Sequence, residues 1–414
     1  MIHWVVLAQN LNSKISQHVA FYVHVPFCQA RCAYCDFSTY AGLERLIPAY
    51  VAALCREIEH AGQQWGHLAV PTIYFGGGTP SLLPSELLSI LFDTLRFTFH
   101  VSDDAEITLE ANPGTVTTEW LYRLRTLGLN RLSLGVQSAH DDELHLLGRI
   151  HSWAQAVETV AAARAAGFDN LNLDFIYGLP GHTLARWQET LERTLALGPE
   201  HLSLYCLGVE QGTPLEKRIA AGELPPPDED LAAEMYTWAE ERLAEAGYFH
   251  YEISNWARAD LEGGCWWWPR YATSATSEAV SPFVCRHNLT YWRNEPWLGL
   301  GAGAHSWLSG RRWANARHPQ DYVAALEQGH TPVAESEPIG HRLEMGETMM
   351  LGLRLAEGVD GDRFHTRFGI ALETAFGDEL AQLRDLGLLN WNGHVARLTA
   401  RGRLLGNQVF MRFV

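Results

Sequence analysis

The chain has 414 residues, 47% of them hydrophobic, and a formal net charge of −17 at pH 7. This length suffices for two or three domains with a large core, and the acidic balance argues against a nucleic-acid partner, because phosphate binding needs a basic surface. No run of about eighteen apolar residues occurs, so we expect no transmembrane segment. Free cysteines without an export signal predict a cytoplasmic protein.

Short apolar strands alternate with amphipathic helices through the first half of the chain. This alternation predicts a parallel sheet of βα units, and six units rather than eight predict an α/β fold with an open, partial (β/α)6 barrel. Functional groups of such sheets gather at the carboxyl ends of the strands, so we expect one rim to carry the site. The predicted strands are 22–28, 72–75, 106–110, 131–137, 172–178 and 201–206, and the predicted helices are 46–61, 85–97, 118–127, 152–166 and 184–197.

The second half departs from this pattern. A proline-rich break at 224–228 precedes a helix at 229–246, and an aromatic, glycine-rich block contains an apparent loop insertion at 262–284 with three consecutive tryptophans. The last part of the sequence has the pattern of several helices followed by a short hairpin, which is typical of a winged-helix-like domain. In so acidic a chain, we expect this domain to serve in packing or partner contact. We therefore predict an N-terminal extension (1–19), a partial barrel (20–247), a mixed segment (248–330) and a C-terminal winged-helix-like domain (331–414).

Three closely spaced cysteines follow the first strand in a C-x3-C-x2-C pattern: Cys28, Cys32 and Cys35. Three thiolates on one loop can bind three irons of a 4Fe–4S cubane and leave the fourth iron open to another ligand. Zinc is the alternative, but structural zinc needs four protein ligands and the chain has no second C-x2-C pair. An odd number of scattered cysteines argues against a disulfide framework.

With Tyr34 before the third cysteine and Asp36-Phe37 after it, this loop resembles the signature of the radical S-adenosylmethionine (SAM) superfamily. The resemblance is to the branch that contains oxygen-independent coproporphyrinogen oxidases and HemW-type heme chaperones. It implies a 4Fe–4S cluster on the three cysteines, SAM on the open iron and a flavodoxin- or ferredoxin-type electron donor. It also implies that the oxidases carry a fourth cysteine where this chain has Phe37, which favours the chaperone branch.

The turn at 76–80, Gly-Gly-Gly-Thr-Pro, follows a strand, and its glycines allow backbone N–H groups to approach a ligand, although a simple tight turn has the same pattern. Glu110 could contact a ligand, and its alternative role is that of a carboxylate that stabilises the loop after its strand. For Cys206, contact with the adenosine and core packing both stay open. The resemblance implies a SAM pocket formed by Tyr22, Tyr34, Gly77, Gly78, Thr79, Glu110, Gln137, Arg149 and Asp174, with Cys206 as the further candidate.

The segment 286–292 reads Arg-His-Asn-Leu-Thr-Tyr-Trp. A neutral imidazole is a common axial heme ligand, and Tyr291 and Trp292 are suited to wall a porphyrin, although a hydrogen-bonded structural histidine is the alternative. The segment resembles the H-N-x-x-Y-W motif of HemW-type chaperones, which makes His287 the heme candidate.

We therefore expect a protein that binds heme and transfers it to acceptor hemoproteins. Peripheral membrane contact stays open, because no basic amphipathic helix is evident. The alternatives are a coproporphyrinogen oxidase that decarboxylates propionates and an iron–sulfur regulator that binds DNA.

Overall fold

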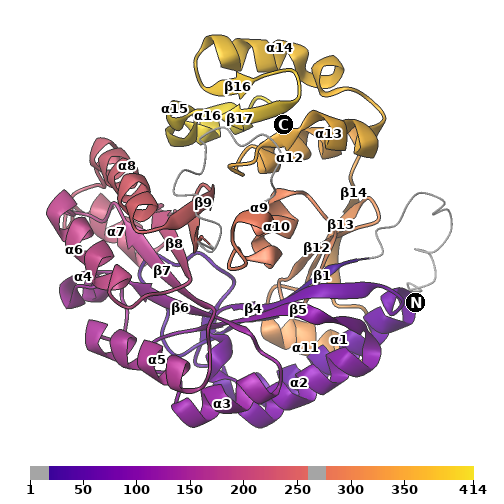
Figure 1. The fold of residues 1–414 in the computed structure, drawn as a ribbon. Helices are drawn as coiled ribbons and strands as arrows, with labels where there is room; N and C mark the ends of the chain where they lie inside the picture. Colours follow the sequence, from indigo (N-terminus) through magenta and orange to yellow (C-terminus); the bar gives the residue numbers. More distant parts are fainter. Residues whose placement is uncertain (1–17, 260–276) are drawn as a thin grey trace. The chain divides into compact units, whose positions relative to one another are not determined.

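A computed structural model describes residues 18–259 and 277–414 (Figure 1). These residues form two compact units, each assembled from separate stretches of the chain. The first unit contains the described residues up to 171 together with 208–223 and 295–338, and the second contains the rest. Most of the predicted extension (1–19), and the predicted insertion as far as residue 276, lie outside the described residues. The four-part division of the sequence stays a prediction.

A largely parallel sheet organises the first unit (Figure 1). Its strands follow the order β14-β13-β12-β11-β1-β4-β5-β6. The strands β11, β1, β4, β5 and β6 are parallel, whereas β12, β13 and β14 continue the sheet antiparallel. The strands are β1 (Ala20–Val25), β4 (Ala69–Gly77), β5 (His100–Ala111), β6 (Arg131–Gln137), β11 (Trp297–Leu300), β12 (His305–Leu308), β13 (Arg311–Asn315) and β14 (Val333–Pro338), with a separate short pair β2 (Phe27–Cys28) and β3 (Tyr40–Ala41).

Several helices of the first unit begin at a local start signal in the sequence. Thr117 accepts a hydrogen bond from the backbone of Trp120 at the start of α3, and Ser152 and Gln155 form a capping box at the start of α5. Pro48 lies in the first turn of α1. The helices are α1 (Ile47–Trp65), α2 (Ser85–Thr98), α3 (Thr118–Thr126), α4 (Asp141–Leu146), α5 (Trp153–Ala165), α7 (Pro214–Ala220) and α11 (Pro319–Glu327).

The strands of the second unit's first part follow the order β7-β8-β10-β9. Strands β7 and β8 are parallel, and β10 pairs antiparallel with both of its neighbours. The elements of this part are β7 (Leu171–Tyr177), α6 (Leu184–Leu195), β8 (His201–Cys206), α8 (Glu229–Glu245), β9 (Tyr248–Glu252), β10 (Asn255–Arg258), α9 (Ser277–Val280) and α10 (Arg286–Trp292).

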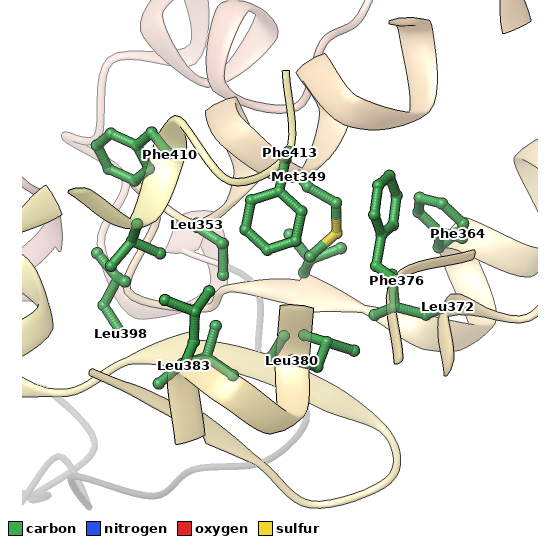
Figure 2. Close-up of a cluster of buried hydrophobic side chains, with 14 of the residues drawn as sticks. Met349, Leu353, Phe364, Leu372, Phe376, Leu380, Leu383, Leu398, Phe410 and Phe413 are labelled. Atoms are coloured by element: carbon green, nitrogen blue, oxygen red, sulfur yellow. The ribbon is translucent and has the colours of Figure 1, made fainter. Parts of the chain in front are cut away.

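The C-terminal end of the second unit has its own apolar cluster, shown in Figure 2. Phe376 packs edge-on against Phe413 with ring centroids 5.3 Å apart, and Met349, Leu353 and Leu380 are all buried around them. The elements are α12 (His341–Gly352), β15 (Val359–Asp360), α13 (Gly361–Phe368), α14 (Leu372–Asp385), β16 (Leu389–Trp391), β17 (Val395–Leu398), α15 (Ala400–Leu404) and α16 (Gly406–Phe410).

The predicted fold class is confirmed: the protein is α/β, and its largely parallel strands do not close into a barrel. The predicted strands and helices of the first half appear with ends shifted by a few residues. Strand β11, which pairs with β1, was missed, because nothing local in its sequence marks a partner more than two hundred residues away. No helix within 18–259 or 277–414 is long and apolar enough to cross a membrane.

Candidate functional site

The cysteine loop is held at both ends and in its middle by backbone hydrogen bonds. It begins in β2 and returns at β3, where Tyr40 donates to the carbonyl of Pro26 at 2.7 Å. In the middle, Ala33 donates to the carbonyl of Leu147 and accepts from the amide of Leu215, both at 2.9 Å. Strand β1 pairs with β11 on one side and with β4 on the other, and the loop follows β1 at the carboxyl edge of the sheet. The loop is therefore positioned by the fold.

Each thiol of the loop has a polar side chain next to it. The contacts are Thr79 Oγ1 to Cys28 Sγ at 3.7 Å, Arg149 Nη1 to Cys32 Sγ at 3.4 Å and Thr39 Oγ1 to Cys35 Sγ at 3.9 Å. Such contacts suit sulfur atoms that carry negative charge, as cluster thiolates do. Within 18–259 and 277–414, however, no three His, Cys, Asp or Glu side chains form a metal-ligand set.

Asn112 connects the residues that contact two of these thiols. Its Nδ2 donates to Thr79 Oγ1 at 3.0 Å, and its Oδ1 accepts from Arg149 Nη2, which also donates to the carbonyl of Gly135 at 2.7 Å. Burial opposes the charge on the guanidinium, but neighbouring Tyr34 and Cys32 outweigh it and raise the pKa of Arg149. The buried Nε of Arg149 has no partner among the described residues. A bound group with an acceptor at this place fits that vacant donor.

The glycine turn uses its backbone N–H groups inside the protein. Gly77 donates to Glu110 Oε2 at 3.1 Å, Gly78 to the carbonyl of Val25 at 2.8 Å and Thr79 to the carbonyl of Phe27 at 2.7 Å. This differs from the expected contact of these N–H groups with a ligand.

The fold itself requires two of these glycines. Gly77 has φ +112°, and a Cβ there would lie 2.4 Å from the ring of His24. A Cβ on Gly78 would lie 2.5 Å from the carbonyl oxygen of Phe27, a backbone atom that cannot turn away. The glycine motif therefore has a packing reason that is independent of any bound cofactor.

Next to the glycine turn, polar and ring contacts connect four side chains: Glu110, Tyr74, Tyr22 and His24. Glu110 Oε1 accepts from the hydroxyl of Tyr74 at 2.8 Å, and Tyr74 stacks at 6.4 Å on Tyr22. The hydroxyl of Tyr22 contacts His24 Nδ1 at 2.9 Å, and His24 Nε2 donates to the carbonyl of Ser38 at 3.0 Å. Burial lowers the pKa of His24. In its neutral form His24 accepts from Tyr22, and so links β1 to the segment behind the cysteine loop.

Gln137 lies at the end of β6 in a left-handed backbone conformation, with φ 73°. Such a conformation is uncommon for a residue other than glycine and often marks a functional position. A Cβ on Gly135 would come within 3.3 Å of the side chains of Gln137, Asn112 and Arg149. The missing side chain at Gly135 thus makes the space in which these three polar groups meet.

A small pocket opens beside this group. It has a volume of about 20 Å³, which is room for a water molecule. The buried His151 uses Nε2 on the carbonyl of Val136 at 3.1 Å, and its Nδ1 has no partner among the described residues. The pocket is lined by Gln29, Ala30, Cys32, Thr79, Asn112, Thr115, Gly148, Arg149, Ile150 and His151.

Two predicted SAM residues, Asp174 and Cys206, lie in the second unit. Asp174 is on β7 and accepts from Asn172 Nδ2 at 2.8 Å. Cys206 ends β8 and is exposed, which argues against core packing. Their role in SAM binding stays a prediction.

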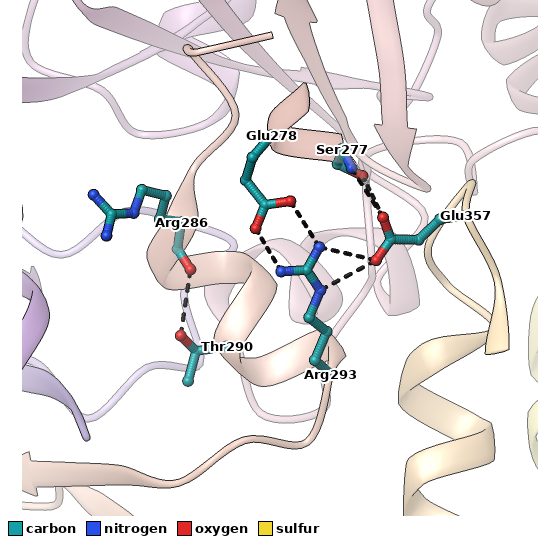
Figure 3. Close-up of polar contacts among 6 residues, drawn as sticks. All are labelled: Ser277, Glu278, Arg286, Thr290, Arg293 and Glu357. Atoms are coloured by element: carbon teal, nitrogen blue, oxygen red, sulfur yellow. Dashed lines mark hydrogen bonds and ion pairs between the residues drawn. The ribbon is translucent and has the colours of Figure 1, made fainter. Parts of the chain in front are cut away.

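The heme-candidate segment forms helix α10. His287 is 1% exposed, and its Nε2 contacts the hydroxyl of Tyr291 at 3.0 Å, with the two rings edge to face at 5.0 Å. At the far end of the helix, Arg293 pairs with Glu278 at 2.5 Å and with Glu357 at 2.9 Å, as Figure 3 shows. Axial ligation through Nε2 of His287 therefore requires Tyr291 to withdraw.

Sequence reasoning missed Asn112, Gly135 and His151. A glycine inside a strand signals close approach by another group, so Gly135 carried a usable sign. Asn112 follows directly after Glu110 and Ala111 at the end of β5, where polar side chains of a parallel sheet gather. His151 had no local signal, because its burial depends on tertiary packing.

Two family models match the chain: the radical SAM superfamily over residues 22–194 and the HemN C-terminal domain over 341–405. The chain is 38% identical to the heme chaperone HemW of Mycobacterium tuberculosis, over 95% of this chain and 94% of that protein. It is 35% identical to the heme chaperone HemW of Bacillus subtilis, over 95% and 98%.

The fold is similar to the solved structure of the coproporphyrinogen III oxidase HemN from Escherichia coli, described as a radical SAM enzyme. The TM-score is 0.81 at 24% identity, covering 96% of this chain and 90% of that one. At this identity the likeness shows the fold alone. The identity to the HemW proteins extends over nearly the whole chain, and it shows that the chain belongs to the HemW family of the radical SAM superfamily.

Proposed function

We propose that this protein is a cytoplasmic heme chaperone that binds heme and transfers it to acceptor hemoproteins. It carries a 4Fe–4S cluster on Cys28, Cys32 and Cys35 and exchangeable SAM beside it. One observation carries the proposal: three thiols on a fold-positioned loop, each contacted by a polar side chain, in a chain 38% identical to a heme chaperone over 95% of its length.

The residues around the loop have distinct tasks in this proposal. Arg149 places a cation beside Cys32 and presents its vacant Nε to the carboxylate of SAM. Glu110 holds the glycine turn, and Gln137 and Asp174 supply polar groups for SAM hydroxyls. When bound, the cluster supplies single-electron chemistry to SAM, with electrons from a flavodoxin- or ferredoxin-type donor.

The remaining predicted residues complete the pocket. Tyr22 and Tyr34 flank cluster and adenine, Gly77, Gly78 and Thr79 border the amino acid end of SAM, and Cys206 faces the adenosine.

Heme ligation is assigned to His287. Its imidazole lies on a short helix whose Tyr291 and Trp292 are suited to contact a porphyrin face. Because His287 is buried and bonded to Tyr291, heme uptake involves opening of the first turns of α10. Release to an acceptor is the reverse change, in which Tyr291 recovers its contact with Nε2.

The alternative function is that of an oxygen-independent coproporphyrinogen III oxidase. Its support is the shared fold, which does not decide an activity. Against it stands Phe37, whose side chain occupies the place of the oxidases' fourth cysteine and is 65% exposed. A phenylalanine has no thiol, so the fourth cysteine that the resemblance implies for the oxidases is absent here.

The test is an anaerobic heme titration of the cluster-loaded protein, followed through the Soret band, in the wild type and in His287→Ala. We expect one heme per chain in the wild type and a Soret band that is strongly weakened in the variant. His330→Ala, at an exposed histidine after α11, serves as the matched control and should titrate as the wild type does.

The same samples are then given SAM, reductant and coproporphyrinogen. Formation of decarboxylated product without stable heme binding would replace the chaperone by the oxidase. Equal heme binding by the wild type and His287→Ala would remove His287 from the proposal.

A further inference from the structure

A chain of hydrogen bonds runs through the second unit from Asp174 to the start of α10. Asn172 Nδ2 donates to Asp174 Oδ1 at 2.8 Å, and Asn172 Oδ1 lies 2.6 Å from His201 Nδ1. On its other side, His201 Nε2 lies 2.8 Å from the hydroxyl of Tyr251. That hydroxyl accepts from the backbone N–H of Cys285 at 3.4 Å. Cys285 is the N-cap residue of α10, the helix that carries His287.

The donors and acceptors along this chain have one consistent direction. The Nδ2 of Asn172 donates to Asp174, which leaves Oδ1 of Asn172 as the acceptor. This Oδ1 accepts from His201 and from the hydroxyl of Ser203 at 3.1 Å. His201 therefore carries its proton on Nδ1, and in the neutral imidazole Nε2 is an acceptor. Tyr251 then donates to Nε2 and keeps a lone pair for the N–H of Cys285. The bond from Asn172 to Asp174 thus fits one direction of donation for every group as far as α10.

The chain is enclosed in the core. His201, Tyr251 and Cys285 are 0% exposed and Asn172 is 3% exposed. Solvent cannot replace a bond that is lost there, and hydrogen bonds in series polarise one another. The side chain of Cys285 makes no capping bond to the first turn of α10, and its backbone N–H is held by Tyr251.

We propose that Asn172, His201 and Tyr251 are positioning residues that couple the SAM site to the heme helix. SAM bound at Asp174 donates ribose hydroxyls to its carboxylate, which then accepts less strongly from Asn172. The weakening passes through His201 and Tyr251 to Cys285, the first turn of α10 opens more readily, and His287 becomes accessible. This inference rests on the proposed function for the roles of Asp174 and His287.

The first experiment measures α10 itself and needs no heme. Amide hydrogen exchange of the segment 284–292 is compared with and without SAM in cluster-loaded, unreduced protein. In the wild type, SAM should accelerate exchange in the first turn about fivefold, at the lower end of ordinary coupling between sites. In Tyr251→Phe, exchange should already be fast and should not respond to SAM.

Tyr248→Phe is the matched control, because it makes the same change on the same strand. The hydroxyl of Tyr248 donates to the carbonyl of Pro199 at 2.5 Å, outside the chain of hydrogen bonds. We expect the wild-type response in this variant. If Tyr251→Phe does not fold, the wild-type comparison alone still decides: an unchanged exchange rate on adding SAM overturns the inference.

The second experiment adds heme. Linkage requires that SAM lower the dissociation constant of heme by about the same fivefold factor in the wild type, and by none in Tyr251→Phe. If SAM leaves the dissociation constant of heme unchanged or raises it in the wild type, the coupling is overturned. It is also overturned if SAM changes this constant by the same factor in the wild type and in Tyr251→Phe. If the exchange response is present but heme binding does not depend on His287, the coupling stands and the assignment of His287 fails.

Discussion

Glu57→Gln should remove much of the pH dependence of stability of the first unit. Glu57 lies on α1 and is buried, and three groups donate to its carboxylate: the hydroxyl of Tyr322 at 2.5 Å, the amide of Gly301 at 2.7 Å and Asn315 Nδ2 at 2.6 Å. These bonds favour the charged form, but burial outweighs them and raises the pKa of Glu57 to about 7.

The sign follows from proton linkage. Because the pKa of the native carboxyl lies above that of the unfolded chain, the native state binds more protons between pH 4.5 and about 7. The contribution of Glu57 to stability is therefore greatest at or below pH 4.5 and falls as the pH rises to about 7. A pKa that moves from 4.5 to about 7 corresponds to a loss of about 3 kcal/mol over this window. Glutamine does not titrate, so the variant should not show this loss.

The assay is urea denaturation at pH 5, 6, 7 and 8, followed by tryptophan fluorescence. We expect the change in stability between pH 5 and pH 8 to be about 3 kcal/mol smaller in Glu57→Gln than in the wild type. Glu59→Gln, at an exposed position on the same helix, is the control for general charge effects and should follow the wild type. Parallel pH profiles of the wild type and Glu57→Gln would refute the reasoning.

Three further predictions concern the site. Gly78→Ala should lose most of its iron after reconstitution, measured by iron and sulfide content, because its Cβ meets backbone oxygen, whereas Gly377→Ala, with nothing within 4 Å, should retain it. Asn112→Ala should bind SAM about tenfold more weakly by calorimetry, since a charge-assisted contact to Arg149 is lost, and unchanged affinity would contradict this. Tyr291→Phe should bind heme about two- to tenfold more tightly in a Soret titration, because Nε2 of His287 loses its competitor, and weaker binding would argue against ligation through that atom.

Much of the fold could be predicted because strands and helices follow local periodicity. The strands at 131–137 and 201–206 were placed with their observed ends, since each is a short apolar run closed by a turn. The missed strand β11 is only four residues long and contains Gly299, which weakens its strand pattern. Its place next to β1 depends on a pairing that local sequence does not record.

The candidate site was predictable to a different degree in each of its parts. The spacing of Cys28, Cys32 and Cys35 is a local property, and so it was available from sequence. The role of Asn112, between Thr79 and Arg149, depends on residues 33 and 37 positions away in sequence. The motif around His287 is likewise local and could be recognised from sequence. The burial of His287 depends on distant residues and could not be predicted.

The sequence by itself determined the alternation of strands and helices in the first half of the chain and the spacing of the cysteine loop, because these depend on neighbours in the chain. Only the tertiary structure decided the partner of each polar group. Glu57 and Tyr322 are 265 residues apart, and His201 and Tyr251 are 50 apart, yet each pair shares one buried hydrogen bond. A buried donor must find an acceptor wherever packing brings one, and packing is settled by the whole chain.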